Sequence, residues 1–444
     1  MQNANKIPDL AEYTPAAEPN FQWGSLKGEE FRSIIRLAYD EVVPSGKVGK
    51  EFIRVLTSLF TGYSQGSALE SVALEAIMVA CVLLLQNPHS KSKSKDHVRT
   101  LERRLRAWHG GEIEGLMKEG RTMQYQLHPF ARGSSHDQKE HTARVFSKLV
   151  FEGKIHSAIR FLSDSHGGGV LDLSADMDGR TVFEVLQEKH PPAGEVNIEA
   201  LVSTSEPPDV HLVMFEQITG RSIRNAALRT QGTAGPSGVD AVGWRRICTA
   251  FHKESSGLCD AIAAVARRLC AEYVHPEPLR AFPACRLIPL DKRPGVRPIG
   301  VCEVVRRIMG KAIMEVVKKD VVNTTGPIQL CAGHEGGAEA AVHAMRALFD
   351  DSATDAIMFV DASNAFNRLN RRVALHNIPY VCPAMARILI NVYRSETCLF
   401  VSGRTLHSRE VTMQGDPMAM AMFALATVPL ILPLLRTTQR KPGL

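Results

Sequence analysis

The sequence predicts an α+β protein, and three observations lead to that class. The first half repeats apolar residues at helical spacing over long stretches. In the second half, residues 286–300 form two short apolar runs around a Pro-Gly turn, which is typical of a strand pair. The 444 residues are 44% hydrophobic and 23% charged, as in ordinary folded domains. This composition excludes a wholly disordered, collagen-like or membrane-embedded chain.

The first 208 residues are expected to form a mostly helical region. Apolar periodicity indicates helices over residues 31–42, 52–60, 69–85 and 142–162. Residues 91–106 carry seven cations and two acids, and we favour a solvated linker and exposed helix over a nucleic-acid contact. Proline pairs then mark a linker that ends near residue 208. We therefore divide the chain into regions 1–208 and 209–444, and the sequence assigns no chemistry to the first.

The second region alternates helices with short strands. A glycine-rich turn at 235–240 comes first. The expected helices are 242–251, 258–273, 301–319, 365–378, 383–393 and 417–435, and the expected strands lie within 286–300, at 356–360, and at 397–401 and 405–411. Residues 286–319 carry nine cations and three acids, an excess equal to the net charge of +6 of the whole chain. The positive charge is therefore concentrated in one segment, where it favours a nucleic-acid partner.

Cysteine usage and hydropathy bear on the compartment. The nine cysteines are odd in number and include no Cys-x-x-Cys pair, and the first residues lack the features of a secretory leader. These features favour a reducing, intracellular location. Residues 417–435 are uncharged and almost long enough to span a bilayer, but they contain Pro429 and Pro433. We expect a buried helix that breaks near its end, and no membrane contact.

Asp361 is the first candidate for chemistry, because it would end the buried strand at 356–360. A carboxylate held by rigid backbone can bind a hard cation such as Mg²⁺. A helix N-cap is the ordinary alternative for a lone aspartate at this place.

The residues around Asp361 read Phe-Val-Asp-Ala-Ser-Asn-Ala-Phe from position 359. This string resembles the first catalytic motif of reverse transcriptases. Three further blocks resemble those of non-LTR retroelement enzymes, in the same order: the turn at 235–240, a fingers hairpin at 292–299 and Gln-Gly-Asp-Pro at 414–417. Each block alone is a weak signal, whereas four in order are a strong one.

The resemblance implies a partial right-hand polymerase, with fingers and an incomplete palm built on an antiparallel sheet. It implies an RNA-directed DNA polymerase whose partners are an RNA template, a DNA primer and dNTP. Asp361 and the carbonyl of Ala362 would bind Mg²⁺, which supplies the two-metal chemistry of nucleotidyl transfer. Phe366 would exclude a ribose 2′-hydroxyl.

The remaining roles implied by the resemblance concern nucleotide and nucleic acid. Lys292, Arg293 and Arg297 would contact the triphosphate, with a solvated turn as the alternative. Gln414 and Gly415 would approach the nascent base pair. Arg306, Arg307 and Lys311 would contact nucleic acid from the basic side of a helix. For Asp416, followed by Pro417, we favour a helix cap over a metal ligand.

The sequence departs from the family at one essential point. Reverse transcriptases need a further aromatic-x-Asp-Asp motif after the Gln-Gly block, but the only acid after position 414 is Asp416. We therefore expect a fragment or degenerate copy without polymerase activity. The alternative is a non-enzymatic nucleic-acid-binding relict of the fold. A helical scaffold is the preferred interpretation of the first 208 residues only.

Overall fold

The computed structural model describes residues 43–438 except for short internal gaps. The gaps are 68–69, 87–92, 128–134, 156–157, 160–168, 203–205, 327–328, 331, 353, 355, 357–360, 411 and 414. The expected helix at 31–42 and nearly all of the expected strand at 356–360 lie outside the described residues. The described part is α+β, as predicted from the sequence.

The N-terminal part is helical, as expected. Its helices are α2 (Lys47–Ser64), α3 (Glu70–Leu85), α4 (Ser94–His109), α5 (Ile113–Leu127) and α6 (Ser135–Phe151). Helix α3 is apolar around nearly its whole circumference, and twelve of its sixteen residues are buried. A helix of this kind must lie inside a core.

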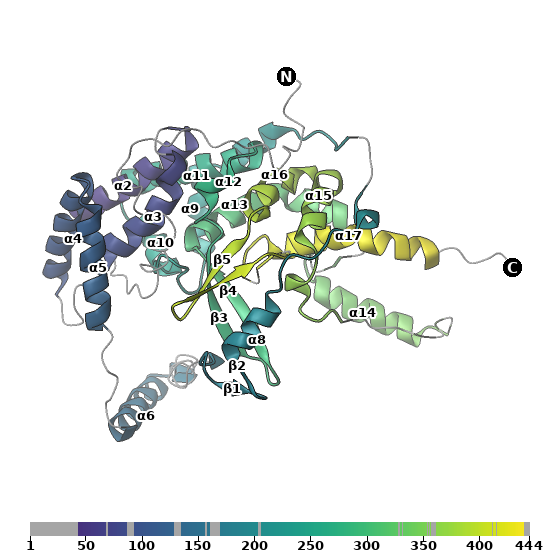
Figure 1. Ribbon diagram of the computed structural model, residues 1–444, viewed down its shortest axis with the longest axis horizontal. Coiled ribbons are helices and arrows are strands. Elements are labelled where there is room, and N and C mark those ends of the chain that lie inside the picture. Colours follow the sequence, from purple (N-terminus) through teal and green to yellow (C-terminus); the bar gives the residue numbers. More distant parts are fainter. Residues whose placement is uncertain are drawn as a thin grey trace.

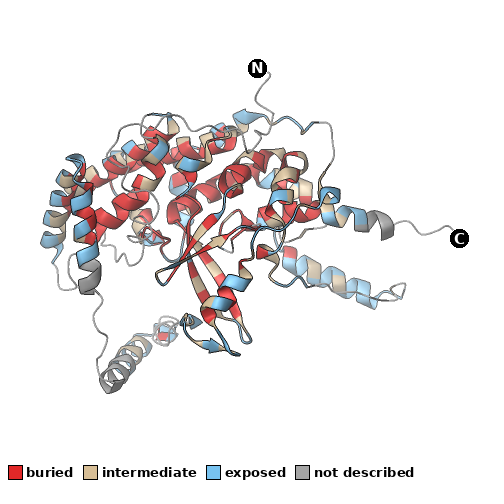
Figure 2. Cartoon of the chain, in the orientation of Figure 1, coloured by how far each residue is buried: buried red, intermediate tan, exposed pale blue. Residues whose placement is uncertain are grey.

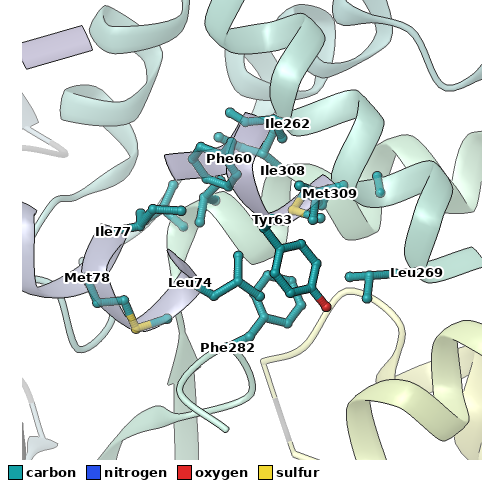
Figure 3. Close-up of a cluster of buried hydrophobic side chains, with 14 of the residues drawn as sticks. Phe60, Tyr63, Leu74, Ile77, Met78, Ile262, Leu269, Phe282, Ile308 and Met309 are labelled. Carbon is teal, nitrogen blue, oxygen red and sulfur yellow. The ribbon is translucent and has the colours of Figure 1, made fainter. Parts of the chain in front are cut away.

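The hydrophobic core crosses the boundary that we placed near residue 208. Helix α2 packs along α11 (Lys253–Ala271), and α3 packs against α12 (Pro276–Leu279). Figure 3 shows Phe60 and Leu74 from the first region among Ile262 and Ile308 from the second. The two regions therefore share one core.

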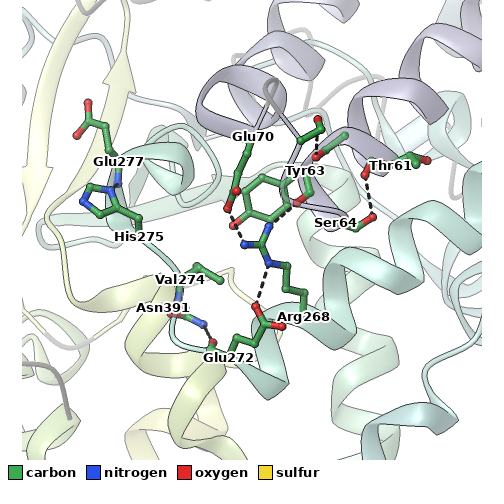
Figure 4. A network of polar contacts seen from close by, with 12 residues as sticks. Thr61, Tyr63, Ser64, Glu70, Arg268, Glu272, Val274, His275, Glu277 and Asn391 are labelled. Carbon is green, nitrogen blue, oxygen red and sulfur yellow. Dashed lines mark hydrogen bonds and ion pairs between the residues drawn. The ribbon is translucent and has the colours of Figure 1, made fainter. Parts of the chain in front are cut away.

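A half-buried arginine reinforces this junction. Arg268 of α11 donates to the carbonyl of Tyr63, to Glu70 (Nη2–Oε1 2.6 Å) and to Glu272 (Nε–Oε2 3.1 Å), as Figure 4 shows. It thereby ties the end of α2 and the start of α3 to α11. Next to it, the Asn391 amide donates to the carbonyl of Glu272 at 2.7 Å.

The other helices of the second region surround a small sheet (Figure 1). They are α9 (Gly220–Arg229), α10 (Ala241–Thr249), α13 (Val304–Thr325), α14 (Gly337–Asp350), α15 (Arg371–Val381), α16 (Pro383–Tyr393) and α17 (Ala419–Thr438). Helix α8 (Val182–Lys189), from the first region, lies against the same sheet. Helix α16 has the predicted bounds. Helix α14 is largely exposed (Figure 2).

The main sheet has four strands in the order β4-β3-β5-β6. These are β3 (Cys285–Asp291), β4 (Val296–Cys302), β5 (Thr397–Val401) and β6 (Arg404–Ser408), and both expected hairpins are present. The expectation of a fully antiparallel sheet is wrong, because β3 and β5 pair in parallel. Helix α8 covers one face through Val182, Val185 and Leu186. A two-stranded hairpin, β1 (Asp176–Met177) and β2 (Arg180–Thr181), precedes α8.

Three predicted helices differ from the structure. The helix expected over 142–162 ends early, because α6 stops at Phe151 and residues 152–153 form a turn. The expected helix at 365–378 is a 3₁₀ turn, Ala365–Asn367, followed by α15, because Asn370 caps a new helix by accepting from the Val373 amide. Helix α17 does not break near its end but runs through both prolines to residue 438. In the part of the chain described here, no helix combines the length and the apolar character needed to cross a membrane.

Candidate nucleic-acid interface

The β3–β4 hairpin presents the cations predicted to contact a triphosphate. Its turn is closed by the Lys292 amide, which donates to the carbonyl of Gly295 at 3.0 Å. Lys292, Arg293 and Arg297 are all exposed. Arg293 pairs with Asp291 (Nε–Oδ2 2.7 Å), an exposed pair of small energetic consequence. The hairpin therefore projects positive charge into solvent.

The two faces of this hairpin differ. Residues such as Cys285 and Leu287 point into the core under α8, as strand alternation requires. On the opposite face Ile288 lies directly across from Ile299, and both are half-buried. Exposed Arg286 and Arg297 lie at the two ends of this face. The outer face is thus a short apolar strip between two cations.

The turn at 235–240 lies at the base of the hairpin. The Ser237 amide and hydroxyl both donate to the buried carboxylate of Glu303, the latter at 2.9 Å. A Cβ on Gly235 would lie 2.7 Å from the Cα of Glu303, so only glycine permits this approach. Burial raises the pKa of Glu303 above its usual range, although the Ser237 hydrogen bonds oppose the rise. The first sequence block is therefore anchored where β4 meets α13.

Arg306 and Asp416 form an ion pair with side chains only 1% and 0% exposed. Arg306 also donates to the carbonyl of Pro283 at 2.9 Å, and the Tyr393 hydroxyl donates to Asp416. Burial by itself would lower the pKa of Arg306, but the Asp416 carboxylate holds it above its ordinary value. We call Ser237, Glu303, Arg306, Tyr393 and Asp416 the buried polar cluster.

These contacts correct one sequence-based expectation, for Arg306, and agree with another, for Asp416. Arg306 is not available to nucleic acid, because its guanidinium is enclosed between Asp416 and the chain at Pro283. Asp416 does accept from the Met418 amide at 2.8 Å, just before α17, which agrees with a capping role. Its main partner, however, is Arg306, a pairing that no local sequence pattern indicates. The carboxylate is already neutralised by a cation.

Arg307 and Lys311, the other predicted contacts on α13, are half-buried and bind backbone. Arg307 donates to the carbonyls of Gln231 (2.9 Å) and Thr233, and Lys311 donates to that of Arg229 (3.1 Å). These bonds hold the segment after α9 against α13. The basic side of this helix is therefore mainly an internal support.

The block at 414–417 packs against the fingers hairpin. Gln414 lies outside the described residues. Gly415 has φ +109°, and a Cβ there would lie 2.4 Å from the carbonyl oxygen of Gly300 in β4. A Cβ on Gly310 of α13 would likewise lie 2.5 Å from the ring of Pro417. Gly415 within the block and Gly310 of α13 thus allow the block to approach β4 and α13 closely.

The block around Asp361 contacts α17 and the segment just before residue 414. The Phe366 ring packs on Phe423 of α17 with centroids 4.9 Å apart, and its carbonyl accepts from the Thr412 amide at 3.3 Å. Phe366 is half-buried, so core packing accounts for its contacts. Asp361 and Ala362 are exposed.

The described residues bring no large set of metal-ligating side chains together. Mg²⁺ requires near-octahedral oxygen ligands, usually with one or two carboxylates. No group of three or more histidine, cysteine, aspartate or glutamate side chains that could hold a metal occurs among the residues the structure describes. The roles of Asp361 and Ala362 as metal ligands therefore stay predictions from the resemblance.

Sequence reasoning missed the segment 189–202, which crosses the surface next to α15. Side chains bind its backbone: Asn364 donates to the carbonyl of Lys189 (2.9 Å), and Asn370 to that of Gly194 (3.1 Å). Asn377 donates to the carbonyl of Ala200 (2.9 Å) and accepts from the Val202 amide (2.8 Å). We call this segment the strap. It looked like a proline-rich linker because its partners lie about 175 residues away.

The sequence was also compared with known proteins. No protein-family model matches this chain, and neither does any curated protein.

Proposed function

We propose that this chain is a nucleic-acid-binding module related to the fingers and palm of reverse transcriptases, and that it binds primer–template without synthesising DNA. The proposal rests on the family resemblance of the four blocks. One observation gives it spatial support: blocks far apart in sequence meet around the buried polar cluster.

The contacts of each block can be followed individually. The turn at 235–240 binds Glu303, at the end of the hairpin that contains the second block. Gly415 and Asp416 of the fourth block contact Gly300 and Arg306. The third block, around Asp361, contacts Thr412, which lies just before the fourth block, and it contacts helix α17, which follows that block. Four unrelated surface loops would have no reason to converge in this way.

The exposed charge then indicates which surface would bind nucleic acid. Arg306, Arg307 and Lys311 are engaged with protein groups, whereas Lys292, Arg293 and Arg297 project from the hairpin. Cations that neutralise phosphates release counterions, and each such contact makes binding more sensitive to salt. We therefore assign phosphate contact to the hairpin turn rather than to α13.

We favour binding without synthesis because few carboxylates in the described part of the four blocks are free to hold metal ions. Two magnesium ions need several anionic oxygens between them. Asp361 is exposed, but Asp416 already neutralises Arg306. The enzymatic alternative requires further carboxylates beyond those gathered here.

Fluorescence anisotropy with a labelled DNA primer on an RNA template tests the proposal. The variant replaces Lys292, Arg293 and Arg297 with glutamine. Its matched control replaces three exposed cations on α4 and α5, namely Lys95, Arg99 and Lys118. We expect the hairpin variant to bind more weakly and to reduce the slope of log affinity against log salt by about 2–3, whereas the control stays near wild type.

Two results would overturn the assignment. Salt-independent binding would exclude phosphate recognition, and an equal loss in the control would place the contact on the basic segment of α4. Primer extension with Mg²⁺ and dNTP is measured on the same complex. Synthesis there would support the enzymatic alternative and contradict the claim that the chain only binds.

A further inference from the structure

Two cysteines face each other at the base of the fingers hairpin. Cys285 begins β3 and Cys302 ends β4, and the two are direct partners in the antiparallel register. Their sulfur atoms are 3.1 Å apart. Both residues are fully buried.

The backbone already satisfies the requirements of a disulfide. Directly opposed residues of antiparallel strands have Cα atoms about 4.5–5.5 Å apart. Disulfides accept Cα separations of about 4.4–6.8 Å and need sulfurs at about 2.05 Å. The two sulfurs therefore need to move together by only about 1 Å, and the strands need not change their pairing.

A cation lies beside the pair. Nη1 of Arg306 is 3.7 Å from the sulfur of Cys302. Hydrogen bonding to Cys302 and burial raise the pKa of the Cys285 thiol, so this cysteine ionises, and attacks an oxidant, only when the hairpin base opens. Asp416 shares this arginine, so the pair adjoins the buried polar cluster.

We propose that Cys285 and Cys302 are a redox-modification site that hydrogen peroxide converts to a reversible cross-strand disulfide. This inference does not depend on the proposed nucleic-acid function. Because both sulfurs are buried, only a small oxidant suits the site. Oxidation then proceeds through local opening of the hairpin base.

The chemistry balances with peroxide as the only co-reactant. One thiolate attacks the O–O bond, which breaks to give a sulfenic acid and hydroxide, and the hydroxide takes up the proton of that thiol to become water. The sulfur of the second cysteine then displaces the sulfenic hydroxyl, which leaves with the second thiol proton as water. Two thiols lose two electrons to one peroxide, yielding one disulfide and two water molecules. A dithiol reductant reverses the reaction.

Peptide mapping of the full chain tests the proposal. The folded protein is treated with peroxide, its remaining thiols are alkylated during unfolding, and trypsin is applied without reductant. Cleavage after Arg280, Arg286, Lys292 and Arg306 releases Cys285 within residues 281–286 and Cys302 within residues 293–306. We expect these two peptides to be joined, two of the nine thiols to be lost, and dithiothreitol to restore both.

The controls distinguish specific oxidation of the Cys285–Cys302 pair from general oxidation of cysteines. Cys270 is equally buried in α11 and should stay alkylatable after the same treatment. A Cys302→Ser variant should retain its other thiols. The wild-type map decides the question even where that variant does not fold.

Two results would overturn the inference. One is recovery of both peptides separately alkylated after peroxide treatment of the folded chain. The other is a 285–302 link that forms no better in the folded chain than in guanidine, where other pairings compete. Oxidation that raises the Tm, as expected for a cross-link that restricts the unfolded chain, would support it further.

Discussion

The buried pair between Arg306 and Asp416 predicts a large and specific loss of stability. The side chains are 1% and 0% exposed, so neither charge can turn to water when its partner is removed. Breaking a buried pair from one side typically costs about 3–5 kcal/mol. In Asp416→Asn the one remaining side-chain oxygen can still accept from the Met418 amide, but an NH2 group replaces the oxygen that accepts from Tyr393 and Arg306, and the charge of Arg306 is left uncompensated. We expect a loss of about 3 kcal/mol.

Urea unfolding followed by circular dichroism measures this loss. The comparison is Glu102→Gln, which breaks an exposed arginine–carboxylate pair with Arg106 on α4. Exposed pairs contribute about 0–1 kcal/mol, so this control should unfold near the wild-type midpoint. A double variant with Arg306→Met should lose less than the sum of the single changes, by about 1–3 kcal/mol.

The result that would refute this reasoning is also clear. If Asp416→Asn and Glu102→Gln shift the midpoint equally, the cluster does not act as a buried charge pair. If the double variant is additive, Arg306 and Asp416 are energetically independent despite their contact.

Three further changes test other parts of the fold. Gly415→Ala should lower the free energy of unfolding by about 1–3 kcal/mol, because alanine would have to adopt φ +109° and would clash with β4. As a control, Gly257→Ala inside α11, where a Cβ would meet nothing within 4 Å, should raise that free energy by about 0.5–1 kcal/mol; thermal unfolding measures both. Burial raises the pKa of Glu75 to about 7, so the folded state holds a proton that the unfolded state loses from about pH 4.5 upward. Stability should fall between pH 4.5 and 7, by at most about 3 kcal/mol, and a flat difference between wild type and Glu75→Gln across that range would contradict the shift. Asn377→Ala removes both bonds to the strap and should cost about 1–3 kcal/mol and speed proteolysis within 189–202; unchanged cleavage would show that the strap is held by other contacts.

Local patterns predicted the elements well because their causes are local. The uniform apolar run of α3, the proline that begins α16 at residue 383 and the tight turns of both main hairpins are all visible within a few residues. The loop between Asn364 and Asn370 was predicted as helix because its residues have no strong breaker. Asn364 there has φ +54°, and the helix begins only after the Asn370 cap.

Long-range features could not be predicted in the same way. The parallel pairing of β3 with β5 joins Cys285 to Leu399, across more than a hundred residues, and no strand records its distant neighbour in its own sequence. Arg306 lies off the apolar stripe expected for its helix, and the sequence predicts that it contacts nucleic acid. Its burial is decided by Asp416, 110 residues later. Counting charges shows where cations lie in the sequence, whereas only the folded structure determines which of them are exposed to solvent.

The same distinction separates the two roles proposed for the basic segment. Arg306 contributes to stability from within the cluster, so Asp416→Asn should shift unfolding but leave primer–template affinity unchanged at temperatures where the chain is folded. Lys292 and its neighbours in the turn are exposed, so their neutralisation should lower affinity without shifting unfolding. If Arg306→Met reduced both affinity and its salt dependence in the folded chain, Arg306 would have to reach phosphate. We assign binding to the hairpin alone because a cation enclosed between Asp416 and Pro283 cannot release counterions, and this result would show that assignment to be wrong.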